Sequence, residues 1–156
     1  MIGQQQRCGG SLLTRLFDSH PQLYVHPLDN YFGRPYKYHW PAIDVSKKGE
    51  EIWKDLIEYP LKYMGQKGRM HKGEYESYRF VYDSGNHERL FLQILGKGAI
   101  KDREVIQAYF DSLFRSYSNY VQPSSPSYYA FFTPRQCLYA EEFFKVIPDG
   151  HIIQII

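Results

Sequence analysis

The residues best placed to do chemistry lie in a short loop near the start of the chain. Residues 3–11 read GQQQRCGGS and are followed by apolar side chains at helical spacing, namely Leu12, Leu13, Leu16 and Phe17. A strand, a glycine turn and a helix in that order direct backbone N–H groups and the positive end of the helix dipole to one point. Gly9 and Gly10 permit close approach of the backbone to a phosphate, and Ser11 adds a hydroxyl donor. The loop therefore predicts an anion-binding site.

The loop differs from the phosphate-binding loop of nucleoside-triphosphate enzymes. On the pattern G-x-x-x-x-G-K-[ST], Gly9 and Ser11 match, whereas Gln4 replaces the first glycine and Gly10 replaces the lysine. The missing lysine disfavours a nucleotide kinase, and the nearest cation is Arg7. A glycine-rich turn before an ordinary helix is the alternative that the loop alone leaves open.

Two segments resemble motifs of the sulfotransferase family that uses 3′-phosphoadenosine 5′-phosphosulfate (PAPS), and they occur in the same order as in that family. Residues 7–29, RCGGSLLTRLFDSHPQLYVHPLD, are similar to that family's 5′-phosphosulfate loop, R-x-G-[ST]-[ST]-L-L, and to the helix ending in L-x-x-H-P that follows it. Residues 132–136, FTPRQ, with the stretch 139–156 behind them, are similar to the family's K-T-P element and its next core strand. The resemblance implies a P-loop-like α/β fold, PAPS as co-substrate without a metal, and a hydroxyl or amine acceptor on a carbohydrate or small molecule.

The resemblance also implies roles for individual residues. Contacts to the donor fall on Gln6, Arg7, Cys8, Gly9, Gly10, Ser11 and Leu12, with Thr133 and Arg135 reaching it from the end of a later strand. Arg7 and the helix N-terminus would stabilise the leaving phosphate. Asp29, near the position of the family's catalytic glutamate, is the first candidate for the base that takes the acceptor proton. His26 is the second candidate. The plain alternatives are a turn at Asp29-Asn30 and an orienting role for the ring of His26.

This chain departs from the family pattern at three places. Gly10 stands where threonine or serine is usual, and Phe132 stands where lysine is frequent. In the family, the strand that resembles residues 151–156 is followed by R-D-P and later by a serine, which hold the 3′-phosphate of PAPS; here the chain stops at Ile156. We therefore expect a single but incomplete domain. The competing hypothesis is a non-catalytic module of the same fold that binds a nucleotide or a partner.

Composition limits the number of domains, the kind of partner and the cellular location to be expected. A chain of 156 residues predicts one domain with a real core, and a net charge of +2 argues against a nucleic-acid partner. No apolar run approaches the roughly 18 residues that span a bilayer, and no signal peptide precedes the loop. Cys8 and Cys137 show no metal-ligand spacing, which predicts a reducing, cytoplasmic location. The oligomeric state is not predicted.

The elements expected around the loop are the strand before it, the helix after it and, far downstream, one βαβ unit. His20-Pro21 ends the first helix near Ser19 because proline disfavours helical backbone before it. A buried strand is expected at 128–132, then a helix at about 136–147 and a strand at 151–156, with a turn at 148–150. One face of that helix would carry Ala140, Phe143, Phe144 and Ile147. This order predicts a parallel sheet with right-handed crossovers.

Residues 30–126 read as an insertion of different character that could shape an acceptor pocket or a lid. Helices are expected at 49–63, interrupted by Pro60, at 88–95 and at 101–120. The last would begin with Asp102 as its cap, and its apolar stripe consists of Ile106, Phe110, Leu113 and Tyr117. The aromatic cluster within residues 31–40 could stack on a sugar or aromatic acceptor, or simply pack in a core.

Overall fold

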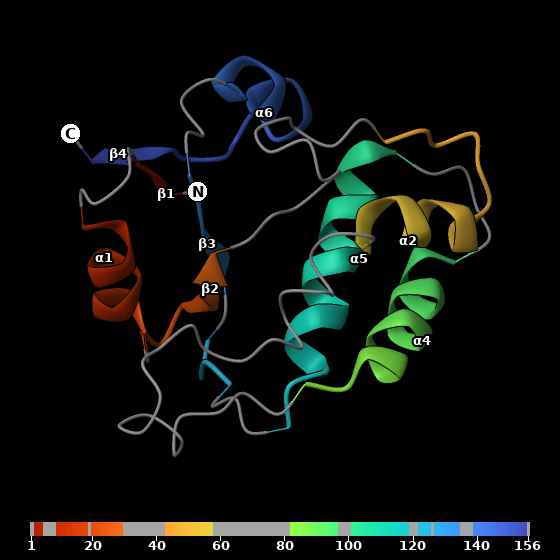
Figure 1. Ribbon diagram of the computed structural model, residues 1–156, viewed down its shortest axis with the longest axis horizontal. Helices are drawn as coiled ribbons and strands as arrows, with labels where there is room; N and C mark the ends of the chain where they lie inside the picture. The colour runs from red at the N-terminus through yellow and green to blue at the C-terminus, as the bar shows by residue number, and fades with distance from the viewer. Residues whose placement is uncertain are drawn as a thin grey trace. The chain divides into compact units, whose positions relative to one another are not determined.

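The computed structural model describes residues 2–4, 9–18, 20–29, 43–57, 82–96, 101–118, 122–125, 127–134 and 139–155. The chain forms two compact units (Figure 1). The first, which we call the sheet unit, combines Met1–Ala42 with Val121–Ile156. The second, the helical unit, is the intervening Ile43–Tyr120 and falls inside the stretch 30–126 that differs in character in the sequence.

The sheet unit is a mixed α/β structure built on a parallel sheet. Its strands are β1 (Ile2–Gln4), β2 (Leu23–Asp29), β3 (Tyr128–Pro134) and β4 (Ile153–Ile155), in the spatial order β2-β3-β1-β4. Every strand pairing in it is parallel. The predicted α/β class and parallel sheet are thus confirmed, and β1 is a central strand between β3 and β4.

Two helices make the crossovers between these strands. Helix α1 (Gly10–Phe17) joins β1 to β2, and α6 (Ala140–Val146) joins β3 to β4. The first crossover runs past β3 and the second runs past β1 in the opposite direction along the sheet. Crossovers of one hand that run in opposite directions place their helices on opposite faces. Figure 1 shows α1 and α6 on opposite sides of the strands.

The core of the sheet unit lies on both faces of the sheet, because consecutive strand residues, which point to opposite faces, are both buried. Val25, Ala130 and Phe131 are buried, as is Phe143 of α6. Phe144, which the sequence placed on the same face as Phe143, is 40% exposed, so that part of the prediction is wrong. Consecutive helical positions are about 100° apart, and only one of the two rings can face the sheet.

Helix α1 buries a different stripe from the one its leucines suggest. It packs on β1, β2 and β3 with Thr14 buried, whereas Leu12 is 62% and Leu16 is 70% exposed. A short side chain at Thr14 permits close approach of the helix to the sheet. The helix ends at Phe17, close to the predicted end, where the N–H of His20 donates to the carbonyl of Phe17.

The turn between α6 and β4 lies where the sequence placed it, at Pro148–Gly150. A Cβ atom on Gly150 would lie 2.5 Å from Cζ of Phe143 and 3.0 Å from the carbonyl oxygen of Ile147. Glycine is therefore required by close packing at this position.

The helical unit contains three described helices, α2 (Gly49–Ile57), α4 (Ser84–Leu95) and α5 (Asp102–Arg115). Helix α4 begins four residues before the predicted Glu88 because the side chain of Asp83 caps it, accepting from the N–H of Asn86 at 2.9 Å. Helix α5 ends at Arg115 rather than Tyr120. Its N-cap is Lys101, whose N–H donates to the carboxylate of Glu104, so the predicted cap at Asp102 is wrong by one residue.

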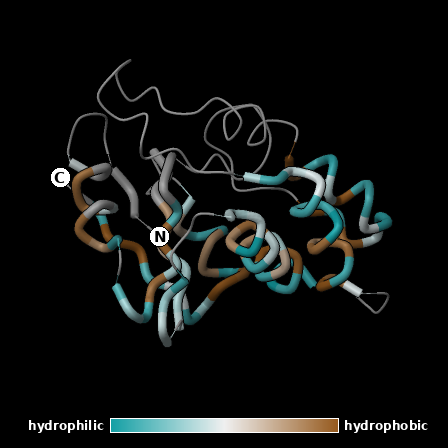
Figure 2. The backbone as a smooth tube through the Cα atoms, turned by 90° about the horizontal axis from the view of Figure 1, so that it is seen from below, coloured by the Kyte–Doolittle hydropathy of each residue, from teal (hydrophilic) through white to brown (hydrophobic). Residues whose placement is uncertain are grey.

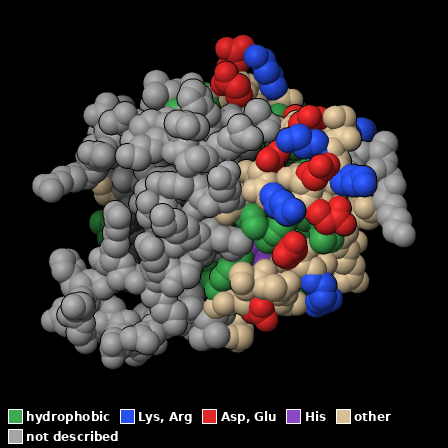
Figure 3. Space-filling view, turned by 45° about the vertical axis from the view of Figure 1, so that its right-hand side comes forward, with side chains coloured by type: hydrophobic (Ala, Val, Ile, Leu, Met, Phe, Trp, Pro, Cys, Tyr) green, Lys and Arg blue, Asp and Glu red, His purple; other side chains and the backbone are tan. Residues whose placement is uncertain are grey.

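The core of the helical unit is aromatic and aliphatic. The predicted stripe of α5 is confirmed, since Ile106, Phe110, Leu113 and Tyr117 are all buried. Helix α2 contributes Ile52, Trp53 and Leu56, and α4 contributes Phe91. Figure 2 shows apolar and polar stretches alternating along the helical segments, as expected for helices with one buried side. Figure 3 shows basic and acidic side chains interspersed on the described part of the face it displays.

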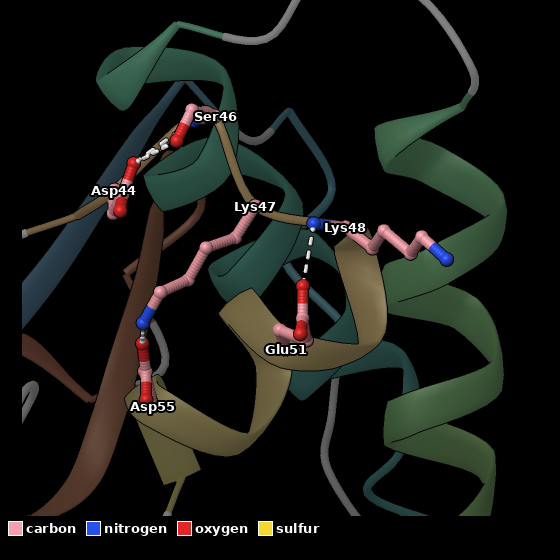
Figure 4. A network of polar contacts seen from close by, with 6 residues as sticks. All are labelled: Asp44, Ser46, Lys47, Lys48, Glu51 and Asp55. Atoms are coloured by element: carbon pink, nitrogen blue, oxygen red, sulfur yellow. Dashed lines mark hydrogen bonds and ion pairs between the residues drawn. The ribbon is translucent and has the colours of Figure 1, made fainter.

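The start of α2 is held by a small polar network (Figure 4). The carboxylate of Glu51 accepts from the N–H of Lys48 at 3.1 Å, and Lys47 pairs with Asp55 at 2.6 Å. Just before the helix, the carboxylate of Asp44 accepts from both the N–H and the hydroxyl of Ser46. The bond from Lys48 satisfies one backbone donor that the helix start leaves unused.

Candidate functional site

The candidate site is built where the central strand β1 leads into α1. Gly9 has φ = +89°, in the left-handed region that favours glycine, and no atom lies within 4 Å of where its Cβ would be. Backbone conformation, not space, therefore selects glycine here. The carbonyl of Gly9 accepts from the N–H of Leu13 at 3.0 Å, which makes it the first acceptor of the helix. The first turn of α1 consequently presents the N–H groups of Gly10, Ser11 and Leu12, which the helix itself does not use.

The strand order places this helix start at a topological switch point, where successive connections run in opposite directions along the sheet. The connection after β1 leads towards β2, and the connection after β3 leads the other way to β4. Open α/β sheets bind ligands beyond the carboxyl ends of strands at such a reversal. The helix dipole adds about half a positive charge at the same point. Chemically, the arrangement suits an anion.

Thr133 lies at this edge of the sheet, next to β1. Its backbone is in register with Gly3, and Pro134 is in register with Gln4. The structure thus brings the end of β3 beside the strand that precedes the glycine turn, and contact of Thr133 with a donor stays a prediction. Arg135, the next predicted residue, lies outside the described residues.

Asp29 ends β2, one strand further from β1. Asp29 is in register with Phe132, and Val25 is in register with Ala130. Four positions separate the two residues of β2, whereas only two separate their partners in β3. The strand therefore bulges by two residues. Pro27 lies within the bulge and cannot donate a hydrogen bond to a ladder, which accounts for the irregularity. The bulge sets the backbone of Asp29 level with Ile2 rather than with Gln4.

His26 lies at the start of the same bulge and is 1% exposed. A ring this buried is enclosed by protein atoms. Its burial favours the orienting role over direct contact with an acceptor.

The remaining predicted residues are divided between described and undescribed parts of the chain. Leu12 and the backbone of Ser11 lie in the first turn of α1. Gln6, Arg7 and Cys8, together with the aromatic cluster within residues 31–40, lie outside the described residues, and their roles stay predictions. In the part of the chain that the structure describes, no group of three His, Cys, Asp or Glu side chains could hold a metal ion.

Sequence reasoning missed a buried polar cluster in the helical unit. His87 is fully buried, its Nε2 lies 3.1 Å from the carbonyl oxygen of Tyr109, and its Nδ1 is bonded to the hydroxyl of Tyr82. His87 has no ligand spacing to other histidines in the sequence. The one available signal was its position on the apolar side of α4, four residues before Phe91.

Comparison of the chain with protein-family models, with characterised proteins and with solved structures finds no match. Within the described residues, no helix is both long and apolar enough to cross a membrane.

Proposed function

We propose that this chain is a PAPS-dependent sulfotransferase domain of P-loop-like fold, whose glycine turn and α1 hold the 5′-phosphosulfate. The observation that carries the proposal is the left-handed Gly9 at the start of α1, beyond the central strand of a β2-β3-β1-β4 parallel sheet. The sequence resemblance across residues 7–29 and 132–156 supplies the identity of the anion. The acceptor would be a hydroxyl or amine of a carbohydrate or small molecule.

In the proposed reaction, an acceptor oxygen or nitrogen attacks the sulfur of PAPS in line with the bond that breaks. A new bond forms from the acceptor to sulfur, and the sulfur–oxygen bond to the 5′-phosphate breaks, releasing adenosine 3′,5′-bisphosphate. Asp29 takes the acceptor proton. Arg7 and the N–H groups at the start of α1 stabilise the charge that builds on the leaving phosphate. Positioning and electrostatics carry most of such a transfer, as in phosphoryl transfer.

The proposal is tested by calorimetry of the purified chain with adenosine 3′,5′-bisphosphate. Arg7→Ala should weaken binding by about 1.5–3 kcal/mol, the usual cost of losing a charge-assisted contact. Arg115→Ala is the matched control, because Arg115 is exposed at the end of α5 in the other unit and should leave the affinity unchanged. Unchanged affinity in Arg7→Ala would remove Arg7 from the proposed site.

The second candidate is a non-catalytic module of the same fold that binds a nucleotide without transferring sulfate. Two residues favour it: Gly10 lacks the hydroxyl, and Phe132 lacks the charge, that the family usually has at these positions. Binding of adenosine 3′,5′-bisphosphate without release of sulfate from PAPS to any acceptor in a broad panel would support this module over the enzyme.

A further inference from the structure

His87 contacts residues of α2, of α5 and of the segment before α4. It belongs to α4, and its Nε2 contacts the carbonyl of Tyr109 in α5. The ring of Trp53, from α2, meets it edge to face with centroids 4.6 Å apart. The hydroxyl of Tyr82, from the segment before α4, meets its Nδ1. The imidazole is fully buried at this junction.

The partners of the ring assign its hydrogen. A carbonyl oxygen only accepts, so Nε2 must carry the hydrogen that it donates to Tyr109. Burial raises the pKa of Tyr82 far above its ordinary value, and the phenol therefore keeps its hydrogen. The Tyr82 hydroxyl accordingly donates to Nδ1, which accepts as the bare nitrogen of a neutral ring. Each of these two hydrogen bonds of the His87 ring thus has one donor and one acceptor.

The cluster lies where α4 begins and α5 ends. The N–H of Asp83 donates to the carbonyl of Ser116 at 3.0 Å, and Tyr82 forms an antiparallel bridge with Tyr117. Ser116 in turn bonds back to the carbonyl of Ser112 through its hydroxyl, at 2.6 Å. The segment before α4 is thus fastened to the end of α5 by backbone bonds, and His87 adds the side-chain link.

We propose that His87 is an acid-sensitive latch of the helical unit: the unit folds around the neutral, Nε2-protonated ring, and protonation of that ring opens the junction between α4 and α5. A second ring hydrogen, on Nδ1, would point at the hydroxyl hydrogen of Tyr82. The hydroxyl would have to turn away and give up its acceptor. The ring would also carry a full charge at a site without solvent contact, which is costly.

Among the described residues, the titratable groups around the ring are the phenols of Tyr82, Tyr109 and Tyr117 and the carboxylate of Asp83 beside Tyr82. Burial also raises the pKa of Tyr109 above its ordinary value, so it stays uncharged. Asp83 is exposed, and its carboxylate is engaged as the cap of α4. From α2, Trp53 contributes an apolar indole.

The direction of the pH effect follows from proton binding. The unfolded chain takes up a proton on a histidine at about pH 6.5, whereas the folded unit resists it. Stability from the latch is therefore fully present above about pH 6.5 and is lost as the pH falls below it. The unfolding constant should rise up to about tenfold for each pH unit in that range.

Histidine-ring NMR of the ¹⁵N-labelled full chain tests the latch directly. We expect His87 to show the Nε2–H tautomer at pH 7.5 and to stay neutral as the pH is lowered, until the amide signals of α4 and α5 change with it. The signals of His20, which is exposed, are followed in the same sample for comparison. An Nδ1–H tautomer, or protonation of His87 alongside His20 with the helical signals unchanged, would overturn the proposal.

Urea unfolding provides the second readout. In a Trp40→Phe background, Trp53 is the sole tryptophan and reports on the helical unit. Between pH 6.5 and 5.0 the unfolding constant should rise by up to about sixteenfold, and His87→Gln should abolish most of that rise while His20→Gln keeps it. An equal rise in His87→Gln contradicts the latch. If His87→Gln does not fold, the NMR titration of the parent chain decides.

Discussion

Gly3 of β1 lies beside Thr133 of β3, in register across the parallel sheet. The two residues come from opposite ends of the chain, and the strand that carries Gly3 leads directly into the glycine turn. This pairing places the end of β3 beside the strand that precedes α1.

The left-handed backbone at Gly9 predicts a specific cost of substitution. Gly9→Ala should lower the free energy of unfolding by about 1–2 kcal/mol, because an L-residue is strained at positive φ although space for the methyl group exists. Gly85→Ala, in the first turn of α4, is the control. Its Cβ would meet only Asp83 Oδ1 at an ordinary 3.6 Å, and it should be neutral or stabilising. Urea denaturation measures both, and an unaffected Gly9→Ala would contradict the turn conformation.

The roles of Asp29 and His26 are separated by kinetics, provided that the proposed transfer is observed. Asp29→Asn should lower kcat by about 10²–10⁴-fold with nucleotide binding retained, since asparagine keeps the shape but cannot take a proton. His26→Gln should leave kcat within about tenfold and instead lower stability, because the ring is buried. A collapse of kcat in His26→Gln with normal turnover in Asp29→Asn would reverse the assignment.

The observed start of α4 and α5 predicts unequal effects of two similar substitutions. Asp83→Ala removes a side-chain cap and should cost about 0.5–2 kcal/mol of stability. Asp102→Ala lies inside the first turn of α5, where only the favourable interaction with the helix dipole is lost, so it should cost no more than about 1 kcal/mol. Thermal or urea unfolding of the two variants gives the comparison, and an equal or larger loss in Asp102→Ala would restore Asp102 as the cap.

The buried phenols predict instability of the helical unit at alkaline pH. Burial raises the pKa of Tyr82 and of Tyr109, whereas phenols of the unfolded chain ionise near pH 10. The stability that these buried neutral phenols give the folded unit is therefore fully present below about pH 10 and is lost as the pH rises above it. Tyr82→Phe should reduce the decline in urea midpoint between pH 9 and 11, and Tyr128→Phe, whose ring is 57% exposed, should leave it unchanged. A decline that is the same in all three proteins would rule out Tyr82 as its cause.

Local patterns in the sequence were reliable where neighbouring residues decide the outcome. Pro21 predicted the end of α1, the apolar stripe from Ile106 to Tyr117 predicted the buried side of α5, and Gly150 marked a turn. Helix starts were less predictable. The cap of α4 is Asp83, five residues before the expected first residue Glu88, and the cap of α5 is Lys101 rather than Asp102.

By itself, the sequence determined the strand and the glycine turn before α1, the order of β3, α6 and β4, and the parallel class of the sheet, because periodicity, proline and glycine act over a few residues. It did not predict the strand β2 (Leu23–Asp29). Tertiary structure alone decided which strands flank β1, the bulge that sets Asp29 opposite Phe132, and the burial of His26 and His87. These features depend on packing and hydrogen bonding between segments distant in the chain. No local pattern encodes the register of such segments or the hydrogen-bond partners of a buried histidine ring such as that of His87.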